Sequence, residues 1–139
     1  ETLPVRMDRI NANTLAIAQF LQSHAKVSWV KYAGLPDAPD HALVKKYMRG
    51  QASGIVTFGV QSGRAGGERF LDALQLIIRL VNIGDTRSLA THPASTTHRQ
   101  LSPEELARAG VSPDMVRLSI GLEHVDDLKA DLDRALAAS

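Results

Sequence analysis

The stretch Met115-Val116-Arg117-Leu118-Ser119-Ile120-Gly121-Leu122-Glu123 places one cation inside a short apolar run that reaches a glycine. The run predicts a β-strand. Because strand side chains alternate between two faces, its branched apolar residues share one face, and Arg117 and Ser119 share the other. A guanidinium stays charged and presents a planar fork of donors that matches a carboxylate. An unpaired charge on a nearly buried strand is very costly, so Arg117 needs a partner. That partner is either an Asp or Glu of this chain or a small anionic ligand.

The composition is that of one globular domain. The chain has 139 residues, of which 44% are hydrophobic and 22% charged, enough for a single core. A formal net charge of +1 gives no electrostatic reason to expect a nucleic acid or an anionic membrane as partner. No apolar run approaches the roughly 20 residues that span a bilayer, and we expect no secretory leader. The lack of cysteine excludes disulfides, thiolate metal sites and a cysteine nucleophile, and is compatible with the cytoplasmic location that we expect.

Helical and extended patterns alternate along the chain. The spacing of apolar residues predicts helices over 3–24, 70–81 and 125–136. A cap at Asp40 predicts a short helix over 40–48, and the capping box of Ser102 and Glu105, closed by Gly110, predicts a helix over 103–109. Runs rich in β-branched or aromatic residues predict strands over 27–32, 54–60 and 88–90 and around Arg117, and 62–67 is interpreted as a loop. These elements predict one α/β domain over 1–139, with a small, mostly antiparallel sheet covered on one face by helices. The first residues already have a mid-helix pattern, so we expect the chain to be part of a longer polypeptide.

Other polar patterns give weaker signals for chemistry. The glycine-rich segment 63–67 lacks both the Gly-Lys-Ser/Thr ending of a P-loop and the dinucleotide-binding spacing, so it is interpreted as a turn. The histidines lack the spacing of a metal motif, and the hydroxyls at 95–97 lack a nucleophile elbow. A solvated helix face, rather than a catalytic carboxylate pair, is the interpretation of Asp126, Asp127, Asp131 and Asp133.

Several blocks of the sequence, taken together, resemble one enzyme family. In order they are Val81-Asn82-Ile83-Gly84-Asp85, Ser88-Leu89, His92-Pro93-Ala94-Ser95-Thr96-Thr97-His98 and Val116-Arg117-Leu118-Ser119-Ile120-Gly121-Leu122-Glu123. Over essentially its whole length the chain resembles the Cys/Met-metabolism class of PLP-dependent enzymes, of the cystathionine γ-synthase type. Other branches of this class commonly have Ser where this chain has Asn82. The asparagine favours the O-acetylhomoserine sulfhydrylase branch.

The resemblance implies a fold-type-I enzyme of which this chain is the C-terminal domain, with a large PLP-binding domain elsewhere. It implies that Arg117 binds the α-carboxylate of the amino-acid substrate and that Asn82 lies beside that carboxylate, partly through backbone atoms. Thr97 matches a residue that supports the arginine. The parent enzyme would be a homotetramer that takes O-acetylhomoserine and sulfide or a thiol, and releases homocysteine and acetate in methionine biosynthesis.

The chain also departs from the family pattern. The family binds PLP through a lysine in a Ser-x-Thr-Lys motif, with an Asp on the pyridine nitrogen and a Tyr stacked on the ring. None of the lysines has that context; they are Lys26, Lys31, Lys45, Lys46 and Lys129. We therefore expect no catalytic, cofactor-binding or metal-binding residue in this chain, which alone would neither bind PLP covalently nor catalyse the reaction.

Two alternatives remain at this point. One is another member of the same family: a cystathionine γ-synthase, a γ-lyase or an O-succinylhomoserine sulfhydrylase. The other is a non-catalytic binding module, which predicts polar surface on all faces. A fragment predicts instead an exposed apolar patch where the large domain docks.

Overall fold

The computed structural model describes residues 1–139, except for the side chain of Pro103. The chain runs through α1 (Leu3–Gln22), β1 (Val27–Lys31), α2 (His41–Tyr47), β2 (Ile55–Val60), α3 (Gly63–Ala73), β3 (Ile78–Arg79), β4 (Leu89–Thr91), the 3-10 turn η1 (Pro93–Ser95), α4 (Pro103–Arg108), β5 (Met115–Ser119) and α5 (Val125–Ala138). None of the described helices is long and apolar enough to cross a membrane.

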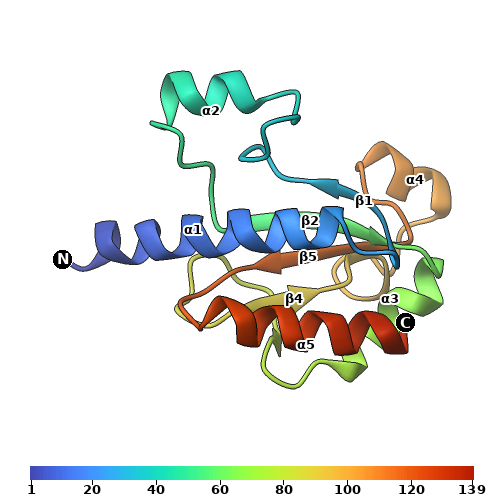
Figure 1. Cartoon of the computed structure of the whole chain (residues 1–139). Helices are drawn as coiled ribbons and strands as arrows, with labels where there is room; N and C mark the ends of the chain where they lie inside the picture. The colour runs from blue at the N-terminus through green and yellow to red at the C-terminus, as the bar shows by residue number, and fades with distance from the viewer.

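The strands form one five-stranded sheet in the order β1-β2-β5-β4-β3. All neighbouring pairs are antiparallel except β3 and β4, which run parallel. Helices α1, α3 and α5 pack on one face of this sheet, with α1 and α5 lying along the strands, while α2 projects away from the body (Figure 1). The predicted α/β class and the mostly antiparallel sheet under a helical layer are confirmed.

The core lies between the sheet and this helical layer. Residues opposite each other in the register point to the same face, and Val56, Phe58, Val116 and Leu118 all point inward and are fully buried. The ring of Phe58 packs edge-on against Phe70 of α3, with 5.5 Å between the ring centroids. The strand over 54–60, which is apolar at nearly every position, therefore lies inside the sheet, between β1 and β5.

Helix α3 differs from its prediction at both ends. The segment 62–67 is not a loop, because α3 begins at Gly63, and the helix predicted over 70–81 ends at Ala73. The carboxylate of Asp131 on α5 accepts the backbone N–H groups of Gln75, Leu76 and Ile77, at 2.8–3.0 Å. These groups can no longer continue the helix, and the chain turns into the edge strand β3.

The same contact corrects the interpretation of Asp131 as part of a solvated helix face. Its side chain is only 2% exposed, and it also pairs with Arg134 on the next turn of α5. Asp126, Asp127 and Asp133 are exposed, as predicted. A buried carboxylate with several N–H donors holds two distant segments together.

Candidate functional site

Arg117 lies in the middle of the sheet face opposite α1, α3 and α5, here called the second face. In the register of β5, Arg117 stands opposite Thr57 of β2 and Thr91 of β4, so these side chains form a row across the sheet. Lys31 of β1 extends this row, because it pairs with Thr57. At a strand spacing of about 4.8 Å, the backbones of Lys31 and Arg117 lie about 10 Å apart. The second face thus presents two cations on one line.

The guanidinium of Arg117 is only partly satisfied within the chain. Its Nη2 donates one hydrogen bond, of 2.8 Å, to the backbone carbonyl oxygen of Asn82. Its Nε is buried and has no partner among the described residues. None of the ion pairs among the described residues includes Arg117. The Asp or Glu partner that the sequence left open is therefore not observed at Arg117. The remaining N–H donors of its guanidinium are available to an anion.

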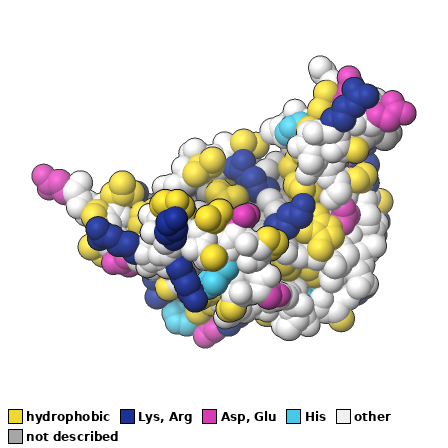
Figure 2. All heavy atoms as spheres, turned by 90° about the horizontal axis from the view of Figure 1, so that it is seen from above, with side chains coloured by type: hydrophobic (Ala, Val, Ile, Leu, Met, Phe, Trp, Pro, Cys, Tyr) yellow, Lys and Arg dark blue, Asp and Glu magenta, His cyan; other side chains and the backbone are white. Residues whose placement is uncertain are grey.

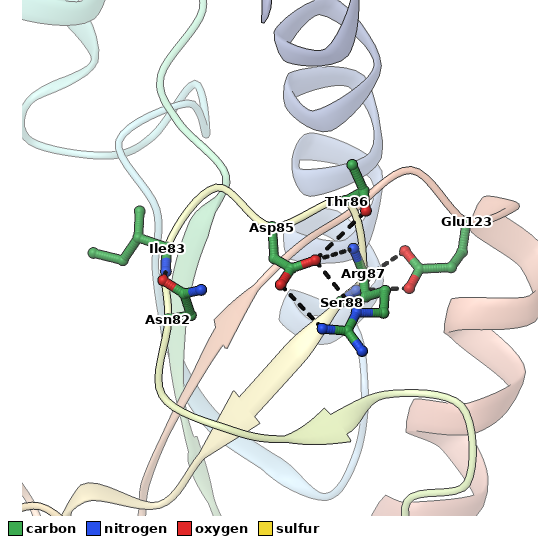
Figure 3. Close-up of polar contacts among 7 residues, drawn as sticks. All are labelled: Asn82, Ile83, Asp85, Thr86, Arg87, Ser88 and Glu123. Carbon is green, nitrogen blue, oxygen red and sulfur yellow. Dashed lines mark hydrogen bonds and ion pairs between the residues drawn. The ribbon is translucent and has the colours of Figure 1, made fainter.

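Asn82 belongs to an exposed loop, 82–87, that leads into β4. Within this loop the side chain of Asn82 accepts the N–H of Ile83 at 2.8 Å, and Asp85 pairs with Arg87 (Figure 3). The guanidinium and the backbone N–H of Arg87 hold the pKa of Asp85 below its ordinary value, and Asp85 raises the pKa of Arg87. Asp85, the acidic residue of this loop, is thus paired with Arg87.

The loop is anchored to the chain that follows β5. The carboxylate of Glu123 accepts both the backbone N–H and the hydroxyl of Ser88, as Figure 3 shows. The N–H of Leu122 donates to the Thr86 carbonyl at 2.8 Å. Gly121 makes this approach possible, because a Cβ there would collide with the Thr86 carbonyl oxygen. Glu123 and Gly121 therefore place the loop that carries Asn82.

Arg117 and Asn82 are brought together as the resemblance implied, whereas Thr97 is engaged elsewhere. The hydroxyl of Thr97 bonds Nδ1 of His98 at 2.8 Å, and no hydrogen bond between described residues joins it to Arg117. The hydroxyls beside Arg117 in the register are those of Thr57 and Thr91, and that of Thr91 bonds the Thr96 hydroxyl at 3.1 Å. Thr91 was not predicted, because only the pairing of β4 with β5 places it there. The role of Thr97 stays a prediction.

The lysine ammonium groups do not meet at this site. That of Lys31 lies over the Trp29 ring, 5.3 Å from its centroid, and that of Lys46 lies over the Tyr47 ring. No hydrogen bond between described residues joins a lysine to Arg117 or Asn82. No group of three or more His, Asp or Glu side chains among the described residues could hold a metal ion.

Apolar side chains are exposed next to the loop that carries Asn82. They lie between residues 76 and 83 and are 37–67% exposed: Leu76, Ile78, Leu80, Val81 and Ile83. Seen from above, hydrophobic and cationic side chains also gather around a hollow in the surface (Figure 2). A surface of this kind is the one expected of a fragment, and differs from the polar surface that a closed binding module predicts.

Comparison with known proteins gives one consistent family. The family model "Cys/Met metabolism PLP-dependent enzyme" matches residues 1–137. O-acetyl-L-homoserine sulfhydrylase 1 of Thermus thermophilus is 56% identical over 137 residues, which cover 99% of this chain and 32% of that protein. O-acetyl-L-homoserine sulfhydrylase of Leptospira meyeri is 50% identical, over 98% of this chain and 31% of that protein.

A solved structure agrees with these matches. It is an O-acetylhomoserine (thiol)-lyase of Campylobacter jejuni that carries N'-pyridoxyl-lysine-5'-monophosphate. Its sequence identity to this chain is 44% and the TM-score is 0.91, over 98% of this chain and 32% of that one. The chain thus spans about a third of the length of the relatives that it matches.

Proposed function

The chain belongs to the family of Cys/Met metabolism PLP-dependent enzymes, and from this premise we propose that it is the C-terminal, substrate-binding part of an O-acetylhomoserine sulfhydrylase. The identities of 56% and 50% to two sulfhydrylases support this choice within the family. The whole protein would join sulfide or a thiol to the carbon chain of O-acetylhomoserine and release acetate. With sulfide, the product is homocysteine.

Arg117 binds the α-carboxylate of the amino-acid substrate in this proposal. The observation that carries the assignment is a guanidinium on the second face that bonds one neutral carbonyl and pairs with no carboxylate among the described residues. A substrate carboxylate would supply the missing negative charge, and the planar fork would fix its orientation as well as its position. The Asn82 carbonyl holds the fork from one side.

The cofactor of the family would be held elsewhere. When bound, PLP supplies the electron sink for breaking bonds next to the amino-bearing carbon. The residues of this chain do not fit its covalent attachment, because no hydrogen bond between described residues joins a lysine to Arg117 or Asn82, and the ammonium of Lys31, in the same row as Arg117, lies over the Trp29 ring. The chain therefore supplies the carboxylate end of the site, and we propose that it is inactive alone.

The rest of the proposal concerns the whole protein. A large PLP-binding domain would cover the exposed apolar side chains near Asn82. A homotetramer and a cytoplasmic location follow from the resemblance alone.

Steady-state kinetics of the full-length protein that carries this chain tests the proposal. With O-acetylhomoserine and sulfide we expect homocysteine, formed faster than from O-succinylhomoserine or cystathionine. Loss of the hydrogen bonds between the Arg117 guanidinium and the substrate carboxylate should cost about 2–4 kcal/mol of binding free energy. Arg117→Ala should therefore raise KM for O-acetylhomoserine about 30-fold or more. Arg64→Ala, which removes an exposed arginine that pairs with Glu68 on α3 and lies outside the segment 76–83, is the matched control and should leave KM unchanged. Equal effects of the two substitutions, or preference for another substrate, would contradict the proposal.

A further inference from the structure

We propose that Glu123 is a positioning residue of the substrate-carboxylate site, acting through Ser88 on the loop whose Asn82 carbonyl holds Arg117. The inference rests on the proposed function, since it assigns a role in the same site. Glu123 does not bond the Arg117 guanidinium, whose described partner is the Asn82 carbonyl. Its effect would therefore pass through the loop.

Both hydrogen-bond donors of Ser88 are satisfied by the carboxylate of Glu123. One carboxylate oxygen of Glu123 accepts the Ser88 N–H at 2.6 Å, and the other accepts the Ser88 hydroxyl at 2.8 Å. The same hydroxyl accepts the Gly121 N–H at 2.8 Å. Ser88 is fully buried, so its donors are satisfied by Glu123 and not by water.

The contact between Glu123 and Ser88 fixes the end of the loop that enters β4. The side-chain bonds of Asn82, Asp85 and Arg87 stay inside the loop and shape it (Figure 3), whereas the Asn82 carbonyl is held from outside by Arg117. Both ends of the loop are attached to the body: the Leu80 N–H, before the loop, donates to the Ala90 carbonyl at 3.2 Å, and the Thr86 carbonyl, at the end that enters β4, accepts the Leu122 N–H. Ser88 adds its bonds to Glu123 at the same end.

The segment that carries Glu123 is itself attached to α1. The side-chain amide of Asn13, on α1, donates to the backbone carbonyls of Gly121 at 3.0 Å and Glu123 at 2.9 Å. Asn13 is 3% exposed, so this attachment is protected from water. The segment 121–123 is thus bonded to α1 on one side and to Ser88 on the other. Its position therefore sets that of the loop, and with it that of Asn82. A shift of about 1 Å at a binding site can cost up to about 10²-fold in rate.

The test uses the full-length protein, with its cofactor bound, and measures KM for each substrate separately. We expect Glu123→Ala to raise KM for O-acetylhomoserine about tenfold, with KM for sulfide and the absorbance of bound PLP changed little. Glu123→Gln keeps one carbonyl oxygen for the Ser88 N–H and should restore most of the affinity. Glu68→Ala removes an exposed glutamate paired with Arg64 and is the matched control. If Glu123→Ala does not fold, Ser88→Ala removes the hydroxyl that joins Glu123 to Gly121, and the same rise in KM is expected.

A double-substitution cycle with Arg117→Lys separates this inference from the proposed function. If Glu123 acts through Arg117, its removal should raise KM much less in the Arg117→Lys background than in the native protein. If Arg117→Lys raises KM but neither Glu123→Ala nor Ser88→Ala does, or if the effects are additive, the positioning role is wrong. If Arg117→Lys itself leaves KM unchanged, the proposed function fails, and this inference with it.

Discussion

Replacing Asp131 by Asn should loosen the junction between α3 and β3 while preserving the shape of the side chain. The carboxylate lies at 2.8–3.0 Å from the backbone nitrogens of Gln75, Leu76 and Ile77 and also pairs with Arg134. An asparagine has a single acceptor oxygen, so one of these N–H groups would face an NH₂ donor and the others would lose a charged acceptor.

The magnitude follows from these bonds. Hydrogen bonds to charged groups contribute about 1.5–3 kcal/mol and neutral ones about 0.5–1.5 kcal/mol. One bond lost and two weakened therefore cost about 3–5 kcal/mol, and relief of the desolvation of a buried carboxylate offsets part of this. We expect a net loss of about 3 kcal/mol, or about 10²-fold in the local opening equilibrium.

Hydrogen exchange of the full-length protein, read on peptides covering 74–78, measures this opening directly. Protection of these amides should fall about 10²-fold in Asp131→Asn. Asp133→Asn is the matched control, because Asp133 lies on the same helix, is 67% exposed and pairs only with His24 at the surface. Equal protection in the two variants would refute the account of how α3 ends.

Two further predictions concern the packing of the core and the loss of folding stability at low pH. Gly67→Ala should lower the thermal midpoint, at a cost of about 1–3 kcal/mol, because its Cβ would lie 2.6 Å from the His92 ring, which is fully buried with both nitrogens hydrogen-bonded. An unchanged midpoint would show that the ring moves freely. Burial raises the pKa of Asp114, but its hydrogen bonds, including the 2.8 Å bond from the Trp29 indole, leave that pKa below its ordinary value. Its contribution is therefore complete above the pKa of the unfolded chain, about 3.9, and is lost as the pH falls through the lower folded-state pKa. Urea unfolding between pH 5 and 2 should show a steeper loss of stability in the native protein than in Asp114→Asn, and parallel curves would contradict this.

Local patterns in the sequence were enough for much of the fold. The alternation around Arg117 predicted its strand and that Arg117 lies on the face opposite Val116 and Leu118. The capping box at Ser102 and Glu105 predicted the start of α4, and both of its hydrogen bonds are present. These features depend on neighbours within a few residues, which a single sequence displays.

The features that were missed depend on residues far away in the chain. Helix α3 contains the glycines of 63–67, which disfavour a helix locally, and it packs against α5, which stabilises it nonetheless. Its end is set by Asp131, 56 residues beyond Gln75. No local pattern carries that information.

The candidate site was predicted only in part for the same reason. Arg117 was identified from its charge in an apolar strand, but the residues alone could not decide between an internal carboxylate and a ligand. Its described partner is the backbone oxygen of Asn82. Because every residue has such an oxygen, the residue type at position 82 does not reveal this contact. Thr91 and the Ser88–Glu123 contact likewise emerge only from strand pairing and loop packing.

The most direct test of the central claim, that Arg117 binds the substrate α-carboxylate, compares two inhibitors of the full-length protein that differ only in that group. L-norleucine carries the carboxylate, and pentylamine is the same chain without it. The native protein should bind norleucine far more tightly than pentylamine, and Arg117→Ala should lose most of that preference, by about 30-fold or more, with little change for pentylamine. A preference that survives in Arg117→Ala, or equal weakening of both inhibitors, would contradict the assignment.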